Sequence, residues 1–213
     1  ADQFGMPQSL PPNSESEPRS YFLWLYGAVV LALGLDSPLG LAGLSSSRMM
    51  SVVFTWARGT PISRDGFEMI RLARGLSEDE FRKKHHTFTV INTNSPLQLD
   101  IPMLNGLMDF AEANQIVIIT PFTLAGSMSP ATLAGTLVQQ TAEVLAVVTY
   151  AQIVRPGAPV MYGSFASNVD MRSGSPALGT PEYTKAALAS GQIARKLGLP
   201  FRSSNTTMSN CSD

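Results

Sequence analysis

The chain has 213 residues, of which 44% are hydrophobic and 15% are charged, and its formal net charge is −1. This length suits a single domain with a substantial core, and the near-zero charge gives no electrostatic basis for binding nucleic acid. One cysteine, Cys211, excludes an internal disulfide framework and fits a reducing, cytoplasmic compartment. The only histidines, His85 and His86, are adjacent and point in different directions on a helix or strand, so we expect no metal site.

The N-terminal part of the chain is polar at first and then strongly apolar. Residues 1–20 are rich in Pro, Ser and Glu, which predicts a flexible arm and not a signal peptide. Residues 21–35 are uncharged and apolar, but a membrane span needs about twenty such residues. We therefore predict a buried helix or a helix–strand pair and no membrane association, with a membrane-anchored binding protein as the alternative. Residues 21–202 are expected to form the folded domain, and residues 203–213 a polar tail.

Short elements are predicted between the apolar run and residue 87. Residues 39–44 form a possible short strand, and residues 51–56 a better one, because they are β-branched and aromatic. A helix with Ser63 or Asp65 as its N-cap is predicted to run to Arg74. A charged helical turn capped by Ser77 follows over residues 76–84, with acidic residues first and basic residues last.

Strand-like and helix-like runs alternate from residue 87 onward. Strands are predicted at residues 87–92, 116–121, 159–163 and 199–202. A helix capped by Asp100 follows the first strand, a long helix opened by Ser129 and Pro130 follows the second, and a helix from Thr180 to about Lys196 follows the third. Residues 122–128 and 164–179 are predicted to be loops. The continuous apolar character of residues 116–121 indicates burial on both faces, as in a parallel sheet.

This alternation predicts an α/β fold with parallel strands joined by right-handed crossovers. An open doubly wound sheet and a β/α barrel both fit. The glycine-rich fingerprints of nucleotide-binding open sheets, GxGxxG and GxxxxGK[ST], do not follow any predicted strand, which favours the barrel. A closed barrel needs eight strands and typically about 250 residues. We therefore predict a partial TIM-type β/α barrel that is incomplete, with its C-terminal strands missing.

Three segments carry a resemblance to a known family. They read TFTVINTNSPLQLD, PFTLAGSMSPATLAGTLVQQTAEVLA and AQIVRPGAPVMYGSFASNVDMRSGSPALGTPE, and they begin at residues 87, 121 and 151. With these segments the chain resembles the trimethylamine methyltransferase family over about residues 66–202, and it looks like a truncated member.

The resemblance implies methyl transfer from a methylated amine, such as trimethylamine or glycine betaine, to the cobalt of a corrinoid. A separate cognate corrinoid protein would carry this cofactor, so the resemblance implies that none binds directly to this chain. The alternative is a non-catalytic fragment of the family that acts as an interaction or structural protein. An unclosed barrel would expose strand edges and so predicts homo-oligomers.

Candidate substrate-binding residues follow from the barrel geometry and from the chemistry of a methylated ammonium ion. Active sites of such barrels lie at the C-terminal ends of the strands. Aromatic faces and a carboxylate hold a quaternary ammonium ion, and an arginine could hold the carboxylate of a betaine. The candidates are Asn94, Phe122, Tyr162, Phe165, Asp170 and Arg172.

Structural alternatives stand beside several of these candidates. Tyr162 could be a core residue, Asn94 could shape a turn, and Asp170 could cap a turn beside Arg172. Gln139 and Glu143 lie four residues apart on the long helix, and we interpret them as its solvated or inter-helix face. The nucleophile would be reduced cobalt from the partner protein, so no catalytic residue is assigned.

Overall fold

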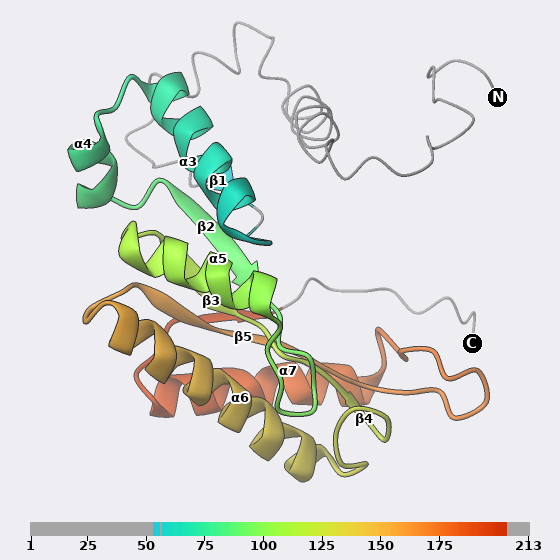
Figure 1. Cartoon of the computed structure of the whole chain (residues 1–213). Helices are drawn as coiled ribbons and strands as arrows, with labels where there is room; N and C mark the ends of the chain where they lie inside the picture. Colours follow the sequence, from blue (N-terminus) through green and yellow to red (C-terminus); the bar gives the residue numbers. More distant parts are fainter. Residues whose placement is uncertain (1–52, 56, 204–213) are drawn as a thin grey trace, which may run out of the picture. The chain divides into compact units, whose positions relative to one another are not determined.

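The computed structural model describes residues 53–55 and 57–203, all of which belong to a compact unit of residues 52–213. The predictions made for residues 1–52 and 204–213, including the apolar run at 21–35, lie outside the described residues. The elements, labelled as in Figure 1, are β1 (Val53–Phe54), α3 (Thr60–Arg74), α4 (Glu78–Lys83), β2 (Thr87–Ile91), α5 (Ile101–Glu112), β3 (Ile116–Ile119), β4 (Phe122–Ala125), α6 (Leu133–Val154), β5 (Val160–Asn168), α7 (Pro181–Lys196) and β6 (Phe201–Ser203).

The strands form one parallel sheet in which spatial order follows chain order. β1 pairs with β2, β2 with β3, and β3 with β5. β4 pairs with the later half of β5, so β3 and β4 act as two halves of one strand interrupted at Thr120 and Pro121. β6 pairs with β5 along its other edge, because Tyr162 is opposite both Ile119 and Phe201. A doubly wound sheet reverses its strand order at a switch point, whereas this order continues in one direction, as in a β/α barrel.

The helices form a continuous layer against this sheet. α3 contacts α5, α5 contacts α6, and α6 contacts α7, while α5, α6 and α7 also contact the strands. Figure 1 shows α5 and α6 lying side by side along the sheet. Neighbouring helices that pack in chain order outside neighbouring parallel strands are typical of a β/α barrel. The predicted fold class, α/β with a partial barrel of parallel strands, is confirmed for the described residues.

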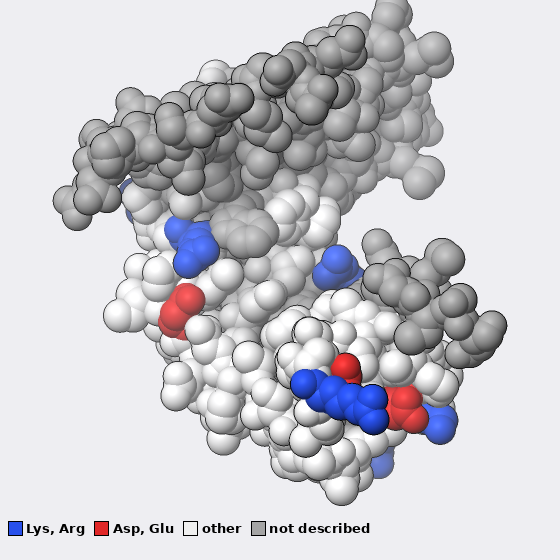
Figure 2. Space-filling view, turned by 90° about the vertical axis from the view of Figure 1, so that its right-hand side faces the viewer, with Lys and Arg blue, Asp and Glu red and all other residues white. Residues whose placement is uncertain are grey.

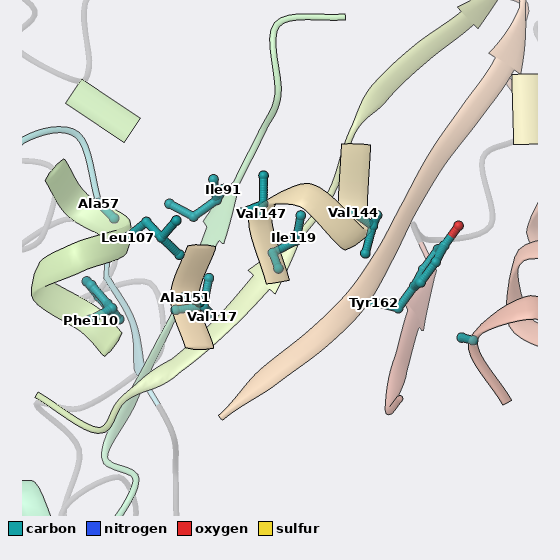
Figure 3. Close-up of a cluster of buried hydrophobic side chains, with 11 residues drawn as sticks. Ala57, Ile91, Leu107, Phe110, Val117, Ile119, Val144, Val147, Ala151 and Tyr162 are labelled. Atoms are coloured by element: carbon teal, nitrogen blue, oxygen red, sulfur yellow. The ribbon is translucent and has the colours of Figure 1, made fainter. Parts of the chain in front are cut away.

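The main core lies between the strands and this helical layer. Strand pairing aligns Ile91, Ile119 and Tyr162 in one row on the face that meets the helices. All three side chains are fully buried, and burial of each contributes up to about 1.5–3 kcal/mol of stability. Figure 3 shows how they meet residues of α5 and α6. The remaining buried members of this cluster are Ala57, Leu107, Phe110, Val117, Val144, Val147, Ala151 and Ala194.

α6 is the one described helix with the length and composition to cross a membrane. Its residues Gln140 and Glu143 are nevertheless buried, and the helix packs on β3, β4 and β5. A core helix of a folded domain also meets this test of length and composition, and the packing of α6 on the sheet fits that role.

Several predicted elements and caps are confirmed. β2, β3 and β6 lie within the predicted ranges to within two residues, and α5 and α7 begin after the predicted caps. The Asp100 carboxylate accepts a hydrogen bond from the Met103 amide, and the Thr180 hydroxyl accepts one from the Tyr183 amide. Ser77 and Glu80 form a reciprocal capping box at the start of α4. Local capping chemistry therefore identified these helix starts from the sequence.

Two predicted helix starts were wrong. α3 begins at Thr60, with Gly59 as its N-cap at φ 97°, and Ser63 is buried within the helix, where its hydroxyl donates to the Gly59 carbonyl. α6 begins at Leu133, because the Thr132 hydroxyl and not the predicted Ser129 accepts from the Gly135 amide. Several residues that can act as an N-cap lie close together before α3 and before α6. The sequence alone did not show which of them caps each helix.

The predicted loops at 122–128 and 164–179 were wrong over residues 122–125 and 164–168, which are strands. β4 covers Phe122–Ala125, and β5 continues to Asn168 and not only to residue 163. The two segments pair with each other, from Phe122 opposite Phe165 to Ala125 opposite Asn168. Each segment alone has a mixed polar character, so only the non-local pairing explains why both are extended.

Candidate functional site: a pocket at the C-terminal ends of the strands

A pocket of about 310 Å³ opens beyond the C-terminal ends of β2 and β4. This volume is at the small end of the range for ligand pockets, about 300–1,000 Å³, and suits a compact ligand. Its position is the one that active sites occupy in β/α barrels. The lining residues are Arg58, Asn92, Thr93, Asn94, Ser95, Asp100, Met103, Phe122 and Met128.

The segment that follows β2 forms much of the pocket wall, and its side chains alternate in direction. Asn92 and Asn94 are exposed, whereas Thr93 is 5% exposed and Ser95 is half-buried. Thr93 donates a short hydrogen bond to Oε2 of Glu143, and the Ser95 hydroxyl donates to the same oxygen at 2.8 Å. Two wall residues of the pocket are therefore tied to α6, while Asn92 and Asn94, on either side of Thr93, are exposed.

The same carboxylate also fixes the backbone of this segment. The amide of Leu97 donates to Oε1 of Glu143 at 3.0 Å. Leu97 has φ 56°, a left-handed conformation that costs a non-glycine residue about 1–2 kcal/mol. Its side chain is exposed, so side-chain packing does not impose this conformation. Glu143 thus holds a strained turn directly after the pocket wall.

Gln139 connects a second loop to this carboxylate. Its Nε2 donates to Oε1 of Glu143 at 3.0 Å and to the carbonyl of Met128 at 2.9 Å. Met128 lies in the segment after β4 and also lines the pocket. One turn of α6 therefore holds both the segment after β2 and the segment after β4.

This arrangement overturns the interpretation of Glu143 as part of a solvated or inter-helix face, because Glu143 is only 3% exposed. The buried stripe of α6 is Thr136, Gln140, the adjacent pair Glu143 and Val144, Val147 and Ala151, and successive positions along it are three or four residues apart. Counting back from the apolar Ala151 and Val147 at helical spacing would have placed Glu143 on the buried face. The polar side chain of Glu143 led instead to the prediction of a solvated or inter-helix position.

Phe122 supplies an aromatic face to the pocket. It stacks on Phe165 of β5, with ring centroids 4.8 Å apart and planes 19° from parallel. Phe165 in turn meets Tyr183 of α7 edge-on at 6.4 Å. The stack fixes the orientation of the Phe122 ring, so its face is preformed for contact with a cation or an apolar methyl group.

Tyr162 lies on the other face of the sheet, in the core. The structure therefore shows Tyr162 as a core residue, which was the alternative to a role in substrate binding. It is fully buried, and its hydroxyl is 3.1 Å from Nε2 of Gln140, which donates to it, and 3.0 Å from the Thr141 hydroxyl. Gln140 is itself fully buried and also donates to Ser190. Tyr162 therefore joins β5 to α6 and does not reach the pocket.

Asp170 and Arg172 lie in the exposed turn after β5 and do not line the pocket. Asp170 accepts hydrogen bonds from the Arg172 amide at 3.0 Å and the Ser173 hydroxyl at 2.8 Å. These two bonds, the Arg172 amide first, hold the pKa of the Asp170 carboxyl below its usual value. Asp170 therefore caps a turn, and of the six predicted site residues the structure brings Asn94, Phe122 and Phe165 together.

The pocket also contains charged residues that sequence reasoning did not select. Arg58, after β1, contributes an exposed guanidinium, and Asp100 lies at the start of α5, where one of its oxygens caps the helix. Arg58 follows the strand predicted at residues 51–56, of which the structure shows β1, but it was not selected as a site residue. Over residues 53–55 and 57–203, no group of three or more His, Cys, Asp or Glu side chains is placed to hold a metal ion.

A family model described as trimethylamine methyltransferase matches residues 43–213 of the chain. The chain belongs to the trimethylamine methyltransferase family. The match extends beyond both ends of the stretch on which the sequence resemblance was based. The pocket and the loops that form it all lie within the matched residues.

Curated relatives share this family and differ in the amine that their names specify. The chain is 45% identical over 147 residues to a glycine betaine methyltransferase of Desulfitobacterium hafniense, covering 69% of this chain and 30% of the relative. It is 34% identical over 133 residues to a trimethylamine methyltransferase of Methanosarcina mazei, covering 62% and 27%. It is 33% identical over 108 residues to a proline betaine:corrinoid methyltransferase of Eubacterium limosum, covering 51% and 22%. The chain thus spans about 30% or less of the length of these relatives.

Figure 2 shows the side of the molecule toward which the loops after β4 and β5 project. On the described part of this face most of the surface is neither Lys, Arg, Asp nor Glu, and the charged side chains form a few separate groups.

Proposed function

We propose that this protein binds a methylated amine in the pocket beyond β2 and β4 and transfers one of its methyl groups to the cobalt of a corrinoid carried by a partner protein. The relatives named for trimethylamine, glycine betaine and proline betaine support the substrate class, and the last name also supports the corrinoid acceptor. The observation that carries the proposal is the preformed face of Phe122 in a compact pocket at the strand ends.

The chain's own residues bind and orient the amine. The Phe122 face attracts a quaternary ammonium ion through its ring quadrupole, which contributes about 0.5–2 kcal/mol depending on desolvation. Asn92 and Asn94 line the mouth with amide groups, which suit the polar part of a betaine. Met103 and Met128 add apolar surface for the methyl groups.

The corrinoid, when its carrier protein docks, supplies a reduced cobalt that accepts the methyl group. The described lining of the pocket fits this division of roles, because it offers amides, hydroxyls and an aromatic face to the amine. We propose that the carrier docks at the open side of the pocket and that the reaction takes place in the cytoplasm.

Methyl transfer to a reduced corrinoid protein tests this function. The chain is incubated with trimethylamine, glycine betaine or proline betaine, and methylation of cobalt is followed by absorbance while loss of the amine is followed by NMR. We expect turnover with at least one amine. Phe122→Leu should lower kcat/KM about fivefold, which corresponds to about 1 kcal/mol of lost cation–π attraction.

The control for the assay is a longer relative of the family with the same corrinoid protein. If this control transfers methyl groups and the chain transfers none from any amine, the proposal is wrong. That result would favour the alternative function, an interaction or structural protein of the same family.

A further inference from the structure

Glu143 is a buried carboxylate whose described partners are all neutral. It is 3% exposed and accepts hydrogen bonds from the Thr93 and Ser95 hydroxyls, the Leu97 amide and the Gln139 side chain. The ion pairs found among the described residues are Arg71 with Glu68 and Arg82 with Glu78, neither of which involves Glu143. Burying a carboxylate is costly, and neutral donors stabilise it without cancelling its charge.

This carboxylate lies directly behind the wall of the pocket. Thr93 and Ser95 line the pocket, and both donate to the same oxygen of Glu143. The hydroxyls of Thr93 and Ser95 thus lie between the carboxylate and the cavity, and Glu143 and Thr93 are both buried. At this distance and low dielectric constant, its field stabilises a cation in the pocket.

We propose that Glu143 is a positioning residue that also supplies the negative charge for a methylated ammonium ion in the pocket, acting through the hydroxyls of Thr93 and Ser95. This inference rests on the proposed function, because it assigns an electrostatic role at the same site. It replaces Asp170, the carboxylate selected from the sequence, with one on α6. Asp100 is the competing carboxylate, but it is half-exposed and water weakens its field.

Glu143→Gln separates the charge of this residue from its structural role. A glutamine carbonyl in the position of Oε1 still accepts from the Leu97 amide and the Gln139 side chain. Its NH₂ group, in the position of Oε2, donates to the Thr93 and Ser95 hydroxyls, which rotate to accept. Every hydrogen bond retains a partner, so the segment after β2 keeps its place while the negative charge is lost.

A pair of isosteric ligands provides the readout. Glycine betaine carries a trimethylammonium group, and 3,3-dimethylbutanoate carries a tert-butyl group of the same shape without the positive charge. Titration calorimetry measures both dissociation constants for the full chain, for Glu143→Gln and for the control Glu182→Gln, which removes an exposed carboxylate on α7.

We expect the wild-type chain to prefer glycine betaine by at least tenfold, and Glu143→Gln to lose most of this preference by weakening betaine binding alone. Glu182→Gln should keep the preference. An equal loss of affinity for both ligands in Glu143→Gln would show a purely structural role and overturn the inference. Unchanged betaine binding in that variant would overturn it as well.

The remaining outcomes separate this inference from the proposed function. If the wild-type chain binds neither ligand, the inference is overturned, and the methyl-transfer assay with all three amines decides the proposed function separately. If it binds both equally, the pocket exists but the charge does not act on it, and only the inference fails. If Glu143→Gln does not fold, Asp100→Asn decides: loss of the preference would assign the charge to Asp100 and overturn the inference, whereas retention would support it.

Discussion

At the scale of single residues, the face of a strand decides the role of an aromatic side chain. Tyr162 and Phe165 are three residues apart on β5, yet Tyr162 faces the helices and Phe165 stacks on the pocket residue Phe122. Both are aromatic side chains of the kind expected at a cation site. Only the register of the sheet separates the core residue from the one behind the pocket wall.

Tyr162→Phe should therefore change stability and leave amine binding intact. The change removes the hydroxyl bonded to Gln140 and Thr141, which costs about 1 kcal/mol of the free energy of unfolding. Urea unfolding measures this loss, and calorimetry with the preferred amine should give the same dissociation constant as the wild type. If Tyr162→Phe weakened amine binding and left stability unchanged, Tyr162 would instead be a substrate-binding residue.

His86 should make the fold sensitive to mild acid. Burial, and then the nearby Arg74 guanidinium, lower the pKa of His86, whose ring stacks on Phe81 and lies 2.9 Å from Arg74 through Nδ1. The unfolded chain binds a proton near pH 6.5, before the folded chain does, so the free energy of unfolding should fall as pH drops below about 7.

The measurement is urea unfolding at intervals from pH 7.5 to 5.5, a range above the titration of most carboxyl groups. His86→Gln retains an acceptor for Arg74 and has no titrating ring, so its stability should vary less over this range. Equal slopes in the wild type and the variant would contradict the assignment to His86.

At the scale of elements, α5 approaches the segment after β1 closely enough to require a glycine. A Cβ at Gly106 would lie 2.4 Å from the carbonyl oxygen of Ala57, and this backbone atom has little room to move. Both residues are buried, at the contact between α5 and this segment. This contact could not be predicted from the sequence, because a glycine inside a predicted helix indicates only a weak helix former.

Gly106→Ala should destabilise the protein by about 1–3 kcal/mol, despite the higher helix propensity of alanine. Thermal and urea unfolding measure the loss. Asn105→Ala, at the neighbouring and less buried position on the same helix, is the control and should have little effect. A stabilised Gly106→Ala variant would mean that α5 can move away from Ala57.

Helix starts with a single cap candidate could be predicted from the sequence, whereas β4 and the end of β5 could not. Asp100 and Thr180 act within three residues of their partners, so local chemistry suffices. β4 and the later half of β5 become strands only by pairing with each other across the length of α6. The site shows the same division: Phe122 follows a predicted strand and was found, whereas Glu143 acts on residues nearly fifty positions away.

At the scale of the whole molecule, the strand order explains why one face of the sheet is less buried than the other. The helices cover the face that contains Ile91, Ile119 and Tyr162. On the opposite face Phe88, Val90 and Met161 are half-buried, and Phe54 on β1, the outermost of the described strands, is 39% exposed. The fold class could be predicted from the alternation of strands and helices in the sequence. The unequal burial of the two faces could not, because it depends on the order of the strands in the sheet.

The chain should therefore self-associate at high concentration through this partly exposed apolar face. Phe54→Lys places a charge on β1 and should shift the sedimentation profile toward the monomer. Leu188→Lys changes a side chain on α7 that is 66% exposed and serves as the control. A wild-type chain that stays monomeric at all concentrations would contradict this prediction.

The segment after β2 divides two tasks between alternate residues. Thr93 and Ser95 anchor it to α6, while Asn92 and Asn94 face the pocket opening. Evolution could then exchange the two asparagines to suit amines of other shapes without disturbing the anchors, since neighbouring side chains point in opposite directions. Members of this family with different amines in their names should vary at the positions of Asn92 and Asn94, and keep a hydroxyl at Thr93 and Ser95 wherever they keep Glu143.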